Sequence, residues 1–326
     1  MNLISRDLDA KEWSDAIVDC LLSSSEEDNK LAEMSMDDYV KHSNYEASFT
    51  NQIWQNTPFK KEELVPQLGT DQSVIMIEIE PDSAGAVQVD LDGDVQPVFT
   101  PYGRRVEMTF QEVASQRIVK SQLELMGYRY NFRTVLTDLT SLRMATVKDT
   151  CFIRGTEACL APTGQNLTYT GKPNQYAWGN NNYFNTSRFG RSLNLMRNHP
   201  NSIEPATVLF NHMMLAGITD STRVDFAGTT VAADMFTQTN STVKLPGFDG
   251  KAIATIKKPI VATGKMYIYG PENQTGRYTQ LIEPTMAVKN EKLRVSMQQY
   301  EVYGMIFINQ AAIAGATFDG SNLIPG

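Results

Sequence analysis

This chain has few of the residues that usually carry chemistry, and no hydrophobic run long enough to cross a membrane. Only three histidines and three cysteines occur in 326 residues, and none lies at the HxH, HxxxH or CxxC spacing of a metal or redox site. No apolar run approaches the roughly 18 residues of a membrane-spanning helix, and the N-terminus lacks the apolar core of a secretory signal. We therefore expect a protein made in the cytoplasm, with no membrane partner.

The remaining candidates for chemistry fail on spacing. The number of cysteines is odd, and Cys151 and Cys159 can share one helix about two turns apart, which is too far for a disulfide. We therefore expect all three cysteines to be reduced thiols. Residues 90–94 lack the glycine and glutamate positions of a calcium loop. Gly264-Lys265 is followed by Met266, not by the Ser or Thr of a phosphate-binding loop. The sequence predicts no catalytic residue, no metal and no cofactor, and therefore a protein that is not an enzyme.

Charge is unevenly distributed along the chain. Residues 1–50 hold twelve acids and four bases, a net charge of −8, and the remaining residues carry 25 of each. A neutral body lacks the concentrated basic patch that sequence-specific DNA binding needs. The charge pattern therefore argues against a sequence-specific DNA-binding protein.

The N-terminal segment begins with helical spacing and continues with polar residues. Asp9 can cap a helix, with Glu12 at the reciprocal position, and apolar residues such as Trp13 and Ile17 then recur on one face. That face can dock on the chain's own body or on a neighbouring subunit. After a polar, mobile link at residues 23–29, we expect an extended arm over residues 37–58.

A long β-excursion follows the arm. Residues 74–80 alternate in polarity as a strand does, and residues 92–93, Asp-Gly, favour a hairpin turn. The apolar residues that alternate along this excursion include Ile75, Ile77, Val87 and Val89. A long hairpin with few packing partners is marginal in water, so we expect another subunit to supply the missing surface.

The middle of the chain predicts mainly helices. Residues 110–126 favour one helix, and residues 132–159 favour a second, long helix whose apolar stripe is interrupted at Asp149. The Asn-, Gly- and aromatic-rich residues 164–201 predict loops, whereas the apolar run 206–210 predicts a buried strand.

The C-terminal part predicts strands. Residues 256–261 and 265–269 flank a short turn, and residues 293–309 favour a longer strand or a pair of strands. Two lysines and a proline within the first run are typical of an edge strand.

Residues 245–318 carry a resemblance to a known family. They read Leu-Pro-Gly-Phe at 245–248, Gly-Lys-Ala-Ile-Ala-Thr-Ile-Lys-Lys-Pro at 250–259, Gly-Lys-Met-Tyr-Ile-Tyr-Gly-Pro at 264–271 and Tyr-Glu-Val-Tyr-Gly at 300–304, before the Ala/Ile-rich residues 311–316. This stretch resembles the closing half of the major capsid protein of tailed bacteriophages (Caudoviricetes). The order of arm, excursion, long helix, mixed centre and β-rich return resembles the Hong Kong-type (Johnson) capsid fold of that family.

The resemblance implies an α+β fold in four parts. These are an N-terminal arm at 1–71, an extended E-loop hairpin at 72–111, a peripheral (P) domain with a long spine helix at 112–200 and 289–326, and an axial (A) domain at 201–288. It implies a major capsid protein that self-assembles into hexamers and pentamers, forming the icosahedral head around the double-stranded DNA of a tailed phage. Such a protein is located in the virion after assembly in the host cytoplasm.

The resemblance also implies partners. These are other copies of the chain, a portal, a separate scaffolding protein and a possible decoration protein, with packaged DNA contacted only non-specifically. Some family members weld subunits through an E-loop lysine, but no lysine occurs between Lys61 and Lys120, so we expect a non-covalent shell. The candidates for contact between subunits are Trp13, Ile17, Ile75, Ile77, Val87, Val89, Arg104, Arg105, Lys257 and Lys258.

Two other functions stay open at this point. The Asn- and aromatic-rich residues 169–188 would suit a virion attachment or glycan-binding protein, which would form a discrete trimer. The same fold would also suit an encapsulin-type compartment shell around cargo enzymes.

Overall fold

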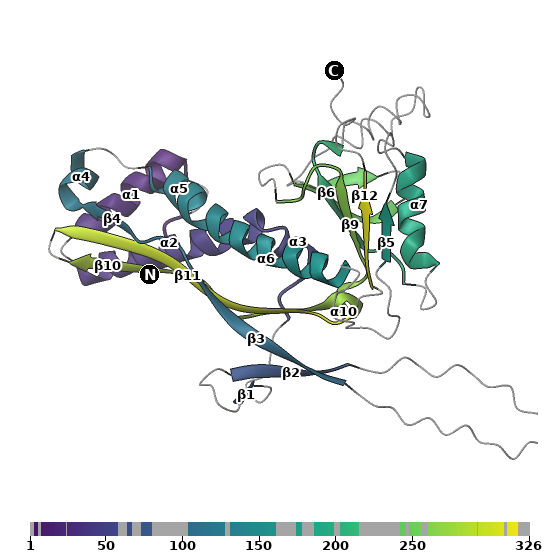
Figure 1. Cartoon of the computed structure of the whole chain (residues 1–326). Helices are drawn as coiled ribbons and strands as arrows, with labels where there is room; N and C mark the ends of the chain where they lie inside the picture. The colour runs from purple at the N-terminus through teal and green to yellow at the C-terminus, as the bar shows by residue number, and fades with distance from the viewer. Residues whose placement is uncertain are drawn as a thin grey trace, which may run out of the picture.

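The described elements form two β-sheets, with helices packed on each. The computed structural model describes residues 3–5, 8–23, 25–57, 64–66, 73–79, 104–127, 131–160, 174–177, 186–198, 203–214, 242–245, 248–255, 260–291, 293–309 and 312–318. The long helix α6 (Leu142–Leu160) runs from one sheet towards the other (Figure 1).

The first sheet is antiparallel and is built around a long hairpin. Its strand order is β1-β2-β3-β11-β10. Strand β4 pairs with the N-terminal part of β11, which β3 does not reach. The strands are β1 (Leu64–Pro66), β2 (Ser73–Ile79), β3 (Arg104–Ala114), β4 (Ile118–Ser121), β10 (Gly276–Glu291) and β11 (Arg294–Phe307). The predicted strand at 293–309 is confirmed as β11, and register shifts between Gln280 and Thr285 mark an irregularity in β10.

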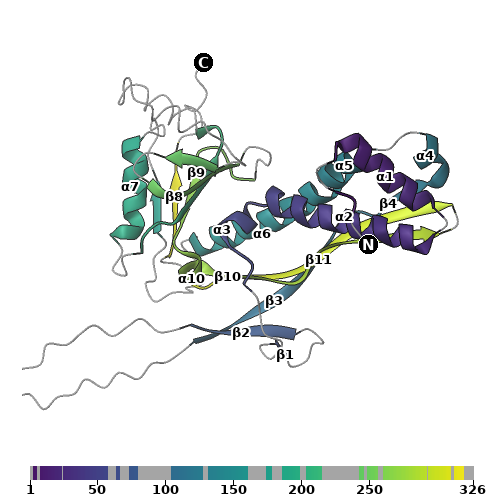
Figure 2. The same cartoon turned by 180° about the vertical axis from the view of Figure 1, so that it is seen from behind.

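Two N-terminal helices, α1 (Ala10–Leu22) and α2 (Glu26–Ala47), cover one face of this sheet (Figure 2). Asp9 caps α1 as predicted, because its carboxylate accepts a hydrogen bond from the Ala10 N–H. The extended arm predicted at 37–58 is wrong, as is the link at 23–29, since α2 begins at Glu26 and is followed by α3 (Thr50–Ile53). Residues at a spacing of four along α2 hold it on the sheet: Ala32, Met36 and Val40.

The middle of the chain corrects one predicted helix and confirms another. Residues 110–126 form the end of β3, then β4, and only then the short helix α4 (Gln122–Gly127), because both strands pair with β11. The long helix is confirmed. It comprises α5 (Phe132–Val135), a π-helical turn (Leu136–Ser141) and α6.

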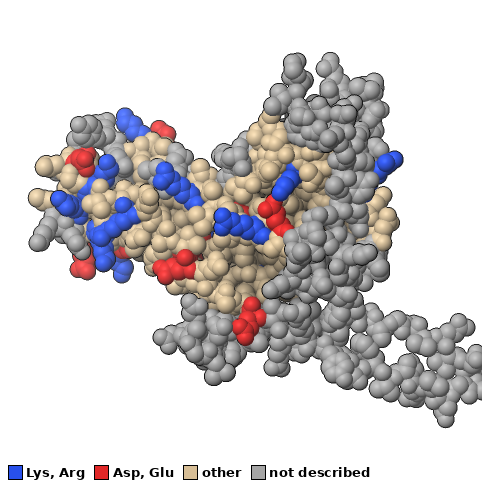
Figure 3. Space-filling view, viewed as in Figure 1, with Lys and Arg blue, Asp and Glu red and all other residues tan. Residues whose placement is uncertain are grey.

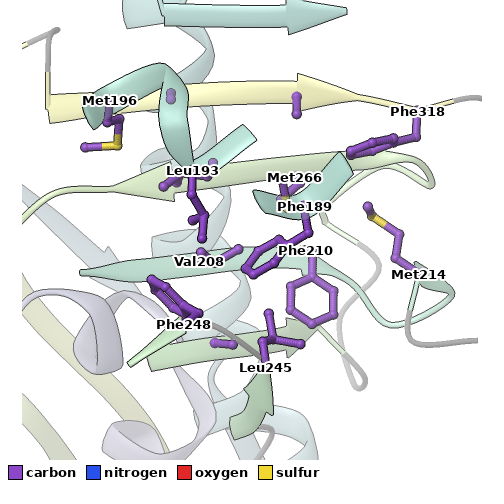
Figure 4. Close-up of a cluster of buried hydrophobic side chains, with 14 of the residues drawn as sticks. Phe189, Leu193, Met196, Val208, Phe210, Met214, Leu245, Phe248, Met266 and Phe318 are labelled. Carbon is purple, nitrogen blue, oxygen red and sulfur yellow. The ribbon is translucent and has the colours of Figure 1, made fainter. Parts of the chain in front are cut away.

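The second sheet mixes parallel and antiparallel pairs in the order β5-β12-β9-β6-β8-β7. Its strands are β5 (Asn174–Ala177), β6 (Thr207–Asn211), β7 (Thr242–Leu245), β8 (Phe248–Thr255), β9 (Lys265–Tyr269) and β12 (Ile313–Thr317). The predicted strands at 206–210 and 265–269 are confirmed as β6 and β9. Helix α7 (Thr186–Arg197) lies where loops were predicted and packs Phe189, Leu193 and Met196 on this sheet (Figure 4).

Sheet membership differs from the predicted division of the chain. Strand β10 belongs to the first sheet, although residues 276–288 were expected in the axial part, and β12 belongs to the second sheet, although residues 313–317 were expected in the peripheral part. Between β9 and β10 the chain passes through the short helix α10 (Glu272–Thr275). The chain therefore crosses between the two sheets at residues 270–275 and returns after β11.

Candidate assembly site

A buried ion pair joins the long helix to the first sheet. Lys148 of α6 and Glu301 of β11 approach to 2.8 Å between Nζ and Oε2, and both side chains are 0% exposed. Lys148 also donates to Asn44 Oδ1 of α2 at 3.3 Å. Its ammonium lies 5.7 Å from the ring centroid of Tyr278 and 5.5 Å from that of Tyr303, so cation–π attraction adds to the pairing.

The neighbouring carboxylate of Asp149 anchors the start of α3. It accepts hydrogen bonds from the hydroxyls of Ser48 and Thr50, at 2.7 and 2.8 Å, and from the backbone N–H groups of Phe49 and Thr50, at 3.3 and 3.1 Å. An acidic side chain at a helix N-terminus satisfies N–H groups that have no partner within the helix. Asp149 therefore fixes the N-terminal segment to the long helix.

Burial governs the ionisation of Glu301. Desolvation raises the pKa of Glu301, while Lys148 opposes the rise and the negative charge of Asp149 adds to it. Glu301 Oε1 has no hydrogen-bond partner among the described residues. The cluster joins α2, α3, α6 and β11 through hydrogen bonds and one buried ion pair.

Aromatic packing beside the cluster is close. Trp54 lies 5.0 Å from Phe152 and 4.6 Å from Phe307, measured between ring centroids. Two glycines allow this approach: a Cβ on Gly155 would lie 2.4 Å from Phe307 Cε2, and one on Gly276 would lie 2.6 Å from Trp54 Cη2. The junction between the helix layer and the sheet is therefore packed without spare volume.

The predicted β-excursion has a paired base. Strands β2 and β3 are antiparallel, with Ile75 opposite Met108, Ile77 opposite Val106 and Arg105 opposite Glu78. The base of the predicted hairpin is therefore confirmed, and four of the proposed contact residues lie in it: Ile75, Ile77, Arg104 and Arg105. Val87, Val89, Lys257 and Lys258 lie outside the described residues.

The structure corrects the proposed role of Trp13 and Ile17. Both are 0% exposed in the chain's own core, where they pack with Met286, Val295 and Met297. Of the two docking modes that the sequence left open, α1 docks on its own body. Neither side chain is accessible to a neighbouring subunit in this conformation.

Lys148 was missed by sequence reasoning, although a signal existed. Lys148 and Asp149 lie on the same helix face as Phe152 and Ile153, and all four are buried. Adjacent charges inside an apolar stripe are costly to bury unless they are paired, so Asp149 marked a buried polar site rather than a break. The partner Glu301 lies 153 residues away, and no local pattern identifies it.

The described part of the chain holds neither a group of metal ligands nor a membrane-spanning helix. No group of three or more His, Cys, Asp or Glu side chains there could hold a metal ion. None of the described helices combines the length and apolar character needed to span a membrane. Cys20, Cys151 and Cys159 are free thiols, with Cys151 and Cys159 both on α6 as predicted.

Comparison with known proteins gives matches in structure only. No family model matches the chain. No curated protein matches its sequence. A virus-like particle from Pyrococcus furiosus is similar in structure, with a TM-score of 0.54, 11% identity, and 87% of this chain and 98% of that chain covered.

Two further solved structures show the same likeness. The capsid of a native GTA particle has a TM-score of 0.56 and 14% identity, covering 84% of this chain and 90% of that chain. The capsid of cyanophage Pam1 has a TM-score of 0.53 and 10% identity, covering 76% and 85%. At these identities the likeness shows the fold, and this chain therefore has the predicted α+β, Hong Kong-type (Johnson) capsid fold.

Proposed function

We propose that this chain is the major capsid protein of a tailed phage, self-assembling into hexamers and pentamers that form the icosahedral head around double-stranded DNA. The observation that carries the proposal is the capsid fold, shared over 76–87% of the chain with a virus-like particle and two capsids. The antiparallel pair β2–β3 supports it, because it lies at the two ends of the segment 80–103, which the sequence predicts to reach over a neighbouring subunit.

The parts of the fold receive their names under this proposal. Residues 72–111 would be the E-loop, α6 the spine helix, the first sheet with α1 and α2 the peripheral domain, and the second sheet with α7 the axial domain. Under this proposal β10 would belong to the peripheral domain, because it pairs with β11, and β12 would belong to the axial domain, because it pairs with β9. Residues 1–71 would be an N-terminal arm whose helices α1 and α2 pack on their own subunit.

The proposal includes partners and a location. The chain would contact other copies of itself, a portal and a separate scaffolding protein, with a possible decoration protein and only non-specific contact with packaged DNA. It would act as a structural protein of the virion and assemble in the host cytoplasm. Without a lysine in the predicted E-loop, the shell would be non-covalent, so boiling in SDS should give single chains only.

Electron microscopy and mass measurement of the expressed, purified chain test the proposal. Hexamers, pentamers, tubes or closed shells are expected, with or without an added scaffolding protein. A stable monomer or discrete trimer that never assembles further at high concentration would refute it and favour an attachment protein. Particles that contain a cargo enzyme instead of DNA would favour a compartment shell.

A further inference from the structure

The two hydrophobic clusters on the first sheet are separated by buried polar side chains. Every second residue of β11 lies on the face that the helices cover. Met297 belongs to the cluster under α1 and α2, and Tyr303 belongs to the cluster around Trp54. The two residues between them on this face, Gln299 and Glu301, are polar and 0% exposed. The core of the first sheet is therefore interrupted along β11.

The helices are interrupted at the same level. On α2, Asn44 follows the residues of the first cluster by about one turn and is 0% exposed. On the long helix, Ser141 and Lys148 lie between Leu136 of the first cluster and Phe152 of the second, and both are 0% exposed. We call the polar side chains of these three elements the polar layer: Asn44, Ser141, Lys148, Gln299 and Glu301.

Contacts bring the members of the polar layer together. The ammonium of Lys148 donates to both Asn44 Oδ1 and Glu301 Oε2. Ser141 lies two turns before Lys148, on the same side of the helix. The residue between them on that side is Ala145, which is 0% exposed and fills little space. On the face seen in Figure 3 charged side chains lie at the surface, whereas Lys148 and Glu301 are 0% exposed.

Five buried atoms of the polar layer have no hydrogen-bond partner among the described residues. They are Asn44 Nδ2, Ser141 Oγ, Gln299 Nε2, Gln299 Oε1 and Glu301 Oε1. A buried polar atom without a partner costs free energy, and most such atoms in folded proteins bond to protein or to ordered water. Because the set contains N–H donors and carbonyl or carboxylate acceptors, its ligand must both donate and accept hydrogen bonds.

The charges of the layer narrow the choice of ligand. The ammonium of Lys148 would repel a metal ion, and the described chain holds no group of three or more metal ligands. The carboxylate of Glu301, with that of Asp149 close enough to raise its pKa, would repel an anion. Water is neutral, donates two hydrogen bonds and accepts two, and a buried water typically makes about three.

We propose that the polar layer binds internal water molecules that bridge Asn44, Ser141, Gln299 and Glu301. The bridges join α2 and the long helix to β11 at the level where apolar contacts are interrupted, and they complete the hydrogen bonding around the Lys148–Glu301 pair. This binding is a property of the single chain and does not depend on assembly into particles.

A structure of the full chain, at a resolution that shows ordered water, tests the proposal directly. Density peaks are expected about 2.7–3.2 Å from Glu301 Oε1 and from the amide of Gln299. A direct hydrogen bond between Gln299 and Glu301, with no density between the layer's other polar atoms, would overturn the proposal. A peak with the anomalous signal of a metal or a halide would overturn it as well.

Urea unfolding of Gln299→Met gives a second test in solution. The substitution keeps roughly the size of the side chain and removes both amide atoms. If water bridges the layer, the remaining groups lose partners and the urea midpoint should fall by roughly 0.3–1 M. In a dry layer the variant would remove two unpaired polar atoms, and the midpoint should rise.

The matched control is Gln111→Met, which makes the same change at an exposed position of β3 and should leave the midpoint unchanged. A rise for Gln299→Met, or a midpoint equal to that of the control, would count against bound water and overturn the proposal. If Gln299→Met does not fold, the density of the wild-type chain still decides between a hydrated and a dry layer.

Discussion

Removing Lys148 should cost the folded chain far more stability than removing Lys148 and Glu301 together. In the native chain the ammonium lies 2.8 Å from Glu301 Oε2 and neither side chain is exposed. Lys148→Met leaves a buried carboxyl without its cation, and truncating one partner of a buried pair costs about 3–5 kcal/mol. That is a large share of the about 5–15 kcal/mol that stabilises a typical domain.

The double variant Lys148→Met/Glu301→Leu removes both charges. Replacing a buried ion pair by packed apolar residues is often neutral or stabilising, so the double variant should regain most of the loss. The coupling free energy between the two positions should then be about 3 kcal/mol or more.

Urea unfolding of the unassembled chain, followed by tryptophan fluorescence, measures these differences, because Trp13 and Trp54 are fully buried. Lys265→Met is the matched control. Lys265 pairs with Glu157 at 2.6 Å, but the two side chains are 38% and 44% exposed, so its loss should cost no more than about 1 kcal/mol. Equal costs for Lys148→Met and Lys265→Met, or a double variant as unstable as the single one, would refute the reasoning.

Three further predictions follow from burial and packing. Because burial raises the pKa of Glu301 above 4.5, the folded chain binds more protons than the unfolded chain between 4.5 and that raised pKa. Stability through this group should therefore fall as pH rises across that window, and Glu301→Gln should flatten this part of the pH profile of urea unfolding. Gly155→Ala would place a Cβ 2.4 Å from Phe307 Cε2 and should destabilise α6 by about 1–3 kcal/mol. Gly190→Ala in α7 meets no atom within 4 Å and should instead stabilise by about 0.5–1 kcal/mol, so a melting experiment that ranks the two variants equally would contradict the packing argument. Burial raises the pKa of Cys159 to about 11. Alkylation at neutral pH should therefore spare Cys159 in the folded chain and modify it in urea, as mass spectrometry would show.

Local patterns predicted the elements whose stability depends on local spacing. The Asp9 cap, the long helix after Phe132 and the buried strand β6 all follow from residues within one or two turns or strand repeats of one another. Local patterns fail where pairing with residues far along the chain determines the secondary structure. Residues 110–126 were predicted as helix, yet residues 110–114 and 118–121 pair with β11, which lies about 180 residues further along the chain.

The sequence alone therefore determined the excess of acidic residues in 1–50, the long helix, the β-rich C-terminal part and the resemblance to a capsid fold. Only the tertiary structure decided that α1 and α2 pack on their own sheet, that Lys148 meets Glu301, and that Asn44, Gln299 and Glu301 lie in one buried polar layer. The physical reason is the same in each case. Burial and pairing free energies depend on which distant residues come into contact, and that is set by the pairing of whole strands, not by the spacing of neighbours along the chain.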